Sequence, residues 1–117
     1  MNNIDAEKLC FTNDGWDEYT AWLKEDKRTL DKINKLIADI MRNGNEGIGH
    51  PEPLKYELSG YWSRTIDEKN RLTYKLLDDG KILIAHCNGH YGDKYFNRIG
   101  NKKEHPKKNQ CGKLKHA

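Results

Sequence analysis

The sequence predicts an α+β fold, in which an antiparallel sheet of about four strands carries an N-terminal helical hairpin on one face. Two observations lead to this prediction. Apolar residues recur every three or four positions between residues 16 and 41, which is typical of amphipathic helices. Between residues 61 and 87 they instead alternate or form short runs, which is typical of strands. A chain of 117 residues is long enough for one such domain.

The N-terminal part of the chain predicts one strand followed by two helices. Residues 9–12 form a short apolar run that ends at Asn13-Asp14-Gly15, as a strand before a helix cap would. The first helix carries an aromatic stripe at helical spacing, made of Trp16, Tyr19, Trp22 and Leu23. Asp26 is the expected cap of a second helix, whose apolar positions continue to Asn43-Gly44-Asn45. Two helices in such close succession indicate a helical hairpin.

A long loop and three strands complete the predicted domain. Residues 43–53 are rich in Gly, Asn and Pro, so we expect a surface loop, and loops of this length often carry functional residues. Strands are predicted over 61–66, 70–77 and 82–87, with Asp78-Asp79-Gly80 forming the hairpin turn between the last two. The alternation along 70–77 places Arg71 on the face that the helices leave open.

The net charge of +3 conceals two parts of opposite sign. Residues 1–91 contain 13 basic and 16 acidic residues, whereas residues 92–117 contain 8 and 2. The second part also has few apolar residues and no periodicity. We therefore predict a folded domain over residues 7–91 and a basic, mostly disordered extension over 92–117.

No segment of the sequence is typical of membrane insertion or export. No apolar run approaches the roughly 20 residues that a membrane span needs. The polar, acidic start of the chain does not have the pattern of a signal peptide. We expect a cytoplasmic protein without a membrane partner.

A carboxylate, a guanidinium and an imidazole, with a neighbouring tyrosine, supply the set of groups needed for RNA cleavage without a metal or cofactor. Glu52 lies between two prolines, whose fixed torsions stiffen the loop around a carboxylate suited to act as a base. The guanidinium of Arg71 can bind a phosphate through two hydrogen bonds. His90 and Tyr91 follow the last strand and can reach the same face. The reaction requires a base for the ribose 2′-hydroxyl, a cation for the phosphate and an acid for the departing 5′-oxygen.

The residues and the order of several motifs between about Lys8 and Tyr91 strengthen this interpretation. They are Trp16-Asp17-Glu18-Tyr19, Asp26-Lys27-Arg28, Lys32-Ile33-Asn34, Pro51-Glu52-Pro53-Leu54-Lys55, Leu58-Ser59-Gly60-Tyr61-Trp62-Ser63-Arg64-Thr65-Ile66, Asn70-Arg71-Leu72-Thr73-Tyr74 and Gly89-His90-Tyr91. Together they closely resemble the YoeB/Txe family of toxins, within the wider RelE/ParE group. The resemblance implies a RelE-like fold with the order β-α-α-β-β-β.

The resemblance also implies a function. A protein of this family is a toxin of a type II toxin–antitoxin pair that cuts messenger RNA in the ribosomal A site and thereby inhibits translation. The implied partners are a cognate antitoxin, the ribosome with its mRNA, and a second copy of the chain. By the same resemblance Glu52 is the general base, Arg71 the phosphate and transition-state ligand and His90 the general acid. Tyr91 then positions the substrate.

Two basic residues and two departures complete the comparison with the family. Lys55 and Arg64 match basic family positions near the RNA path, so the resemblance implies that they bind RNA. The family chain ends at the His-Tyr pair, whereas here 26 residues follow Tyr91. Thr65 stands where the family usually has a second arginine, which removes one phosphate contact. The extension could crowd the site.

Alternative interpretations remain at this point. The chain could be a non-catalytic RelE/ParE-like module that acts on a protein target such as gyrase or in autoregulation with its antitoxin, although such relatives typically lack the Glu/Arg/His set. A zinc site made of His86, Cys87, His90 and Cys111 is disfavoured because a second well-spaced ligand pair is missing. The three tryptophans are most simply core residues. The basic extension could add nonspecific RNA affinity or be a solvated tail.

Overall fold

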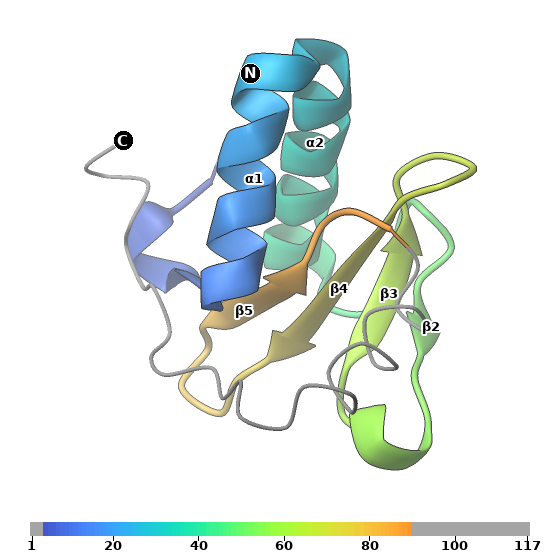
Figure 1. The fold of residues 1–117 in the computed structure, drawn as a ribbon. Helices are drawn as coiled ribbons and strands as arrows, with labels where there is room; N and C mark the ends of the chain where they lie inside the picture. The colour runs from blue at the N-terminus through green and yellow to red at the C-terminus, as the bar shows by residue number, and fades with distance from the viewer. Residues whose placement is uncertain (1–3, 90–117) are drawn as a thin grey trace.

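The computed structural model describes residues 4–89 (Figure 1). Two helices stand side by side over one end of a twisted sheet. The elements in chain order are η1 (Ala6–Lys8), β1 (Leu9–Phe11), α1 (Asn13–Glu25), α2 (Lys27–Asn43), β2 (Glu52–Pro53), η2 (Tyr56–Leu58), β3 (Trp62–Thr65), β4 (Arg71–Leu76) and β5 (Ile82–His86). The predicted α+β class and helical hairpin are therefore confirmed.

Side-chain and glycine caps set the ends of the helices. Thr12, rather than the following Asn-Asp-Gly segment, caps α1 by accepting a hydrogen bond from the backbone N–H of Gly15. Asp26 ends α1 and caps α2, as predicted, by accepting from the N–H groups of Arg28 and Thr29. Gly44 ends α2 with a φ of 67°, a backbone conformation that favours glycine.

The sheet has five strands in the order β1-β5-β4-β3-β2, and it is mixed rather than purely antiparallel. The edge strand β1 runs parallel to β5, with Cys10 opposite Leu83. After β1, the helical hairpin carries the chain to the opposite edge strand, β2, and the antiparallel pairs from β2 to β5 then bring β5 beside β1. The segment predicted as the end of a loop supplies the fifth strand, β2, which pairs with β3. Pro53 is tolerated there because β2 is an edge strand.

The core lies between the helical hairpin and one face of the sheet. Its fully buried side chains include those of Phe11, Ile33, Leu36, Ile37, Leu72, Tyr74 and Ile84. Trp16, Trp22 and Trp62 are partly buried and pack against this cluster, as predicted. Leu23, which the aromatic stripe included, is 50% exposed; it lies in the last turn of α1. The opposite face of the sheet carries the candidate site.

Several predictions fall outside the described residues. The domain end at residue 91 and the basic extension over 92–117 belong to the part of the chain that the structure does not describe. Within residues 4–89, no helix is both long and apolar enough to cross a membrane.

Candidate active site

Strand register brings Glu52 and Arg71 together, although 19 positions separate them in the sequence. Glu52 on β2 pairs with Ser63 on β3, and Arg71 on β4 pairs with Thr65 two residues further along β3. Positions two apart on a strand share a face, so both side chains point to the side of the sheet away from the helices. Nη1 of Arg71 donates to Oε1 of Glu52 at 3.0 Å and lies 3.4 Å from Oγ of Ser63.

This ion pair is accessible to solvent. The Glu52 side chain is 54% exposed and that of Arg71 is 25% exposed. An exposed pair of this kind contributes about 0–1 kcal/mol to stability, so a ligand can displace it at little cost. Both partners therefore offer their charges to a bound molecule.

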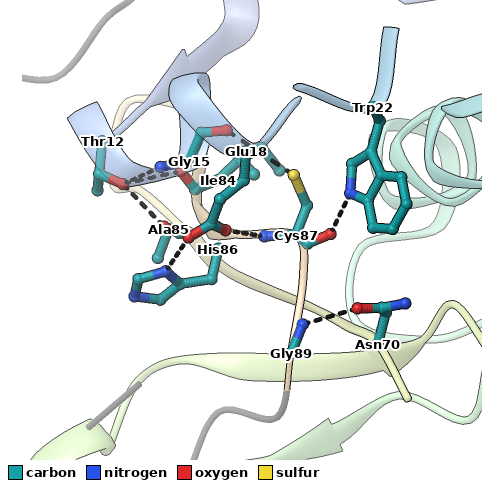
Figure 2. Close-up of polar contacts among 10 residues, drawn as sticks. All are labelled: Thr12, Gly15, Glu18, Trp22, Asn70, Ile84, Ala85, His86, Cys87 and Gly89. Atoms are coloured by element: carbon teal, nitrogen blue, oxygen red, sulfur yellow. Dashed lines mark hydrogen bonds and ion pairs between the residues drawn. The ribbon is translucent and has the colours of Figure 1, made fainter. Parts of the chain in front are cut away.

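The end of the described chain is fixed beside the same arginine. The backbone N–H of Arg71 donates to the carbonyl oxygen of Gly89 at 3.0 Å. The side chain of Asn70 accepts from the N–H of Gly89 at 2.8 Å, as Figure 2 shows. His90 and Tyr91, the predicted acid and positioning residue, lie just outside the described residues. The structure thus brings Glu52 and Arg71 together and anchors the residue that precedes His90.

Helix α1 holds the chain between β5 and Gly89 (Figure 2). Oε1 of Glu18 accepts from the backbone N–H of Cys87 at 2.8 Å, and its Oε2 lies 3.2 Å from Nδ1 of His86. The indole N–H of Trp22 donates to the carbonyl oxygen of Cys87 at 2.8 Å. The sequence motif that contains Glu18 gave no indication of this role.

Arg64 is not on the surface, which contradicts its predicted contact with RNA. Its side chain is completely buried on the helix side of the sheet. Strand alternation explains this position, because Arg64 pairs with the core residue Leu72 and its neighbours Ser63 and Thr65 belong to the other face. The alternation was readable in the sequence, but the expected RNA contact of Arg64 came from the resemblance to the family and not from the strand pattern.

Arg64 instead ties the long loop to helix α2. Its Nη1 lies 2.6 Å from Oδ2 of Asp39, and its N–H groups also donate to the hydroxyl of Tyr74 and to the carbonyl oxygens of residues 44, 46 and 48. Burial opposes the ionisation of Asp39, but hydrogen bonds from Arg64, from the Ile48 N–H and from Asn43 outweigh it and lower the pKa of this carboxyl. Arg64 therefore shapes the loop that leads to Glu52.

The segment after β2 carries the second basic residue predicted to bind RNA. Lys55 is exposed, which is compatible with such a contact. The next residue, Tyr56, is 86% exposed and has a φ of 59°, which is uncommon for a residue other than glycine. No pattern in the sequence had pointed to this tyrosine.

No group of His, Cys, Asp or Glu residues within 4–89 is arranged to hold a metal ion. His86 contacts Glu18, and the buried thiol of Cys87 points to the carbonyl oxygen of Gly15 at 3.7 Å. The other two residues of the disfavoured zinc set, His90 and Cys111, lie outside the described residues.

Comparison with known proteins identifies the family. Residues 11–91 match the family model described as "YoeB-like toxin of bacterial type II toxin-antitoxin system". This chain is a member of the YoeB toxin family. It is 51% identical to the toxin YoeB of Escherichia coli K12 over 84 residues, which cover 72% of this chain and 99% of the relative.

Solved structures of YoeB proteins support the same assignment. A YoeB–YefM complex from Staphylococcus aureus matches with a TM-score of 0.67 and 40% identity, covering 78% of this chain and 99% of the matched chain. A YoeB dimer from the same species matches with a TM-score of 0.68 and 42% identity, covering 74% and 100%. The protein is thus a YoeB toxin of a toxin–antitoxin system, and its RelE-like fold, predicted from the sequence, is confirmed.

Proposed function

We propose that this YoeB toxin is a ribosome-dependent mRNA endonuclease that cleaves the message in the A site and thereby inhibits translation. The observation that carries the proposal is the ion pair of Glu52 and Arg71, a carboxylate and a guanidinium 3.0 Å apart on an accessible sheet face. A base and a phosphate-binding cation are two of the three groups that RNA transesterification needs. The anchored Gly89 and the family membership support the third, His90.

The proposed reaction uses the substrate's own nucleophile. The carboxylate of Glu52 takes the proton of a ribose 2′-hydroxyl, and the 2′-oxygen forms a bond to the adjacent phosphorus. Arg71 binds the phosphate oxygens, on which negative charge increases in the transition state. The bond from phosphorus to the 5′-oxygen breaks, and His90 gives its proton to that oxygen. The products are a 2′,3′-cyclic phosphate, which water can open to a 3′-phosphate, and a 5′-hydroxyl end.

Other residues would hold the RNA in place. Tyr91 is proposed to position the substrate, as in the family. The exposed side chain of Lys55, three residues after Glu52 in the chain, would contact a phosphate. Arg64 has no part in this proposal because it is buried.

The same proposal includes protein partners. The matched proteins from S. aureus are a YoeB–YefM complex and a YoeB dimer. We propose that this chain likewise binds a cognate antitoxin and forms a homodimer. An activity that requires ribosomes places the protein in the cytoplasm.

The test replaces the proposed base and acid in the full-length protein. Purified toxin is mixed with ribosomes programmed with a short mRNA, and cleavage is mapped by primer extension. Glu52→Gln and His90→Gln are each expected to slow cleavage by about 10²-fold or more without a change in circular dichroism. Glu57→Gln is the matched control, because this exposed carboxylate lies nearby in η2.

Two outcomes would contradict the proposal. If the folded wild-type toxin leaves the message intact, with or without its antitoxin, it is not an mRNA endonuclease. DNA-damage signalling with intact mRNA would then favour the non-catalytic alternative. If the wild type cleaves and both variants cleave equally fast, the activity stands but its residues are wrongly assigned.

A further inference from the structure

We propose that Asn70 is a positioning residue for the general acid, because its side chain locks the peptide that precedes His90 against Arg71. The proposal rests on the function proposed above. Asn70 belongs to one of the quoted sequence motifs, but the resemblance assigned it no role, and the proposal now gives a role to the turn between β3 and β4.

A network centred on Asp67 fixes the orientation of the Asn70 side chain. Oδ1 of Asp67 accepts from the backbone N–H groups of Lys69 and Asn70, each at 2.8 Å. The amide nitrogen of Asn70 lies 3.1 and 3.2 Å from the two carboxylate oxygens of Asp67. Since a carboxylate can only accept, the Nδ2 end of Asn70 must face Asp67, and its Oδ1 must face the other way.

The outward-facing oxygen of Asn70 binds the last described residue. Oδ1 accepts the N–H of Gly89 at 2.8 Å, and the adjacent backbone N–H of Arg71 donates to the carbonyl oxygen of Gly89 at 3.0 Å. Both backbone groups of Gly89 are therefore bound by two consecutive residues of one turn. Gly89 has a φ of 67°, so these bonds hold it in a conformation that other residues rarely adopt.

The other end of this short segment is fixed as well. Glu18 and Trp22 of α1 bind the N–H and the carbonyl oxygen of Cys87, and Figure 2 shows both contacts together with the bond from Asn70 to Gly89. Only Asn88 lies between the two anchors. The covalent bond to residue 90 therefore starts from a fixed point beside Arg71.

This arrangement matters for proton transfer. A general acid works only if its proton lies within hydrogen-bond reach of the leaving oxygen, and a misplacement of about 1 Å can cost on the order of 10²-fold in rate. Removing the Asn70 amide frees the N–H of Gly89, whereas Glu52 and the guanidinium of Arg71 keep their own contact. The expected defect is therefore in leaving-group protonation rather than in RNA binding.

The test measures Asn70→Ala in the full-length toxin with ribosomes programmed with a short mRNA. We expect kcat to fall by about tenfold to a hundredfold with little change in KM. The second substrate is the same message with sulfur in place of the 5′-bridging oxygen at the cleaved linkage. A thiolate leaves without a proton, so Asn70→Ala and His90→Gln should regain most of the wild-type rate on it, whereas Glu52→Gln should stay slow.

Further variants separate positioning from folding. Asp26→Ala is the matched control, because it removes a similar set of side-chain caps at the distant N-terminus of α2. It should lower the melting temperature and leave kcat unchanged. The exchange of Asp67→Asn with Asn70→Asp keeps one amide and one carboxylate in the turn, with an oxygen still facing Gly89. We expect this double variant to recover most of the lost kcat. Hydrogen exchange of the Gly89 amide should be fast in Asn70→Ala and slow in the wild type and the other variants.

The outcomes are distinguishable. Equal slowing of Asn70→Ala on both substrates would show that the side chain supports Arg71 or the fold, and would overturn the proposal. A wild-type kcat in Asn70→Ala would overturn it too. If the wild-type toxin cleaves neither substrate, the proposed function itself is wrong, and the role of Asn70 in it is wrong as well.

Discussion

Replacing Arg64 tests whether this residue is structural or binds RNA. Arg64→Met keeps a long side chain in the core but removes the guanidinium, its ion pair with Asp39 and four further hydrogen bonds. Three of the lost acceptors are backbone carbonyl oxygens of residues 44, 46 and 48. The loop between α2 and β2 would therefore lose its main attachment to the sheet.

The expected loss of stability follows from these contacts. Breaking a buried ion pair by removing one partner costs about 3–5 kcal/mol. The lower end applies here, because the Asp39 side chain is 12% exposed and keeps its bonds to Asn43 and Ile48. A loss of about 3 kcal/mol lowers the melting temperature of a domain of this size by roughly 12–24 °C.

Urea unfolding followed by tryptophan fluorescence measures this loss. Arg42→Met, at an exposed position of the same helix that carries Asp39, is the matched control and should change the free energy of unfolding by less than about 0.5 kcal/mol. The structural role would be refuted if Arg64→Met unfolds within about 1 kcal/mol of the wild type. If such a stable variant bound programmed ribosomes more weakly than the wild type, the result would support the predicted contact of Arg64 with RNA.

Two further predictions concern the fold. Burial opposes the ionisation of Asp39 and Asp67, but hydrogen bonds outweigh it and lower the pKa values of both carboxyl groups below the ordinary 3.8. The stability that the two carboxylates provide is therefore present above pH 3.8 and is lost as the pH falls through their folded pKa values. At pH values below about 4, the urea concentration at the unfolding midpoint should therefore fall, and it should fall less steeply in Arg64→Met than in the wild type. An equal fall in the two proteins would contradict the assignment for Asp39. Gly15→Ala should cost about 1–3 kcal/mol in a thermal melt, because a Cβ would overlap the carbonyl oxygen of Ile84, and an unchanged melting temperature would contradict this.

Local signals in the sequence predicted the helices and three of the strands well. Asp26 and Gly44 mark the boundaries of α2 because a cap depends on hydrogen bonds within a few residues. The strands found at Trp62–Thr65, Arg71–Leu76 and Ile82–His86 lie within one or two residues of the predicted ranges. Alternation also placed Arg71 on the face away from the helices.

Pairings between distant segments could not be predicted in this way. The parallel contact of β1 with β5 joins residues more than 70 positions apart, and the two-residue strand β2 exists only through its bonds to β3. The anchoring of Gly89 by Asn70 likewise depends on how β4 meets the end of β5. Such contacts depend on the whole sheet and leave no periodic signal in the sequence.

The ion pair of the site also fits the proposed chemistry energetically. In the free toxin the Glu52 carboxylate forms an ion pair with the guanidinium of Arg71, and in the complex with RNA a phosphate would take the place of this carboxylate. Because the pair is exposed, exchanging one anion for the other costs at most about 1 kcal/mol. Thr65, directly opposite Arg71 on β3, adds no second cation that could hold the carboxylate back. RNA binding would therefore release Glu52 at the moment when the reaction needs a base.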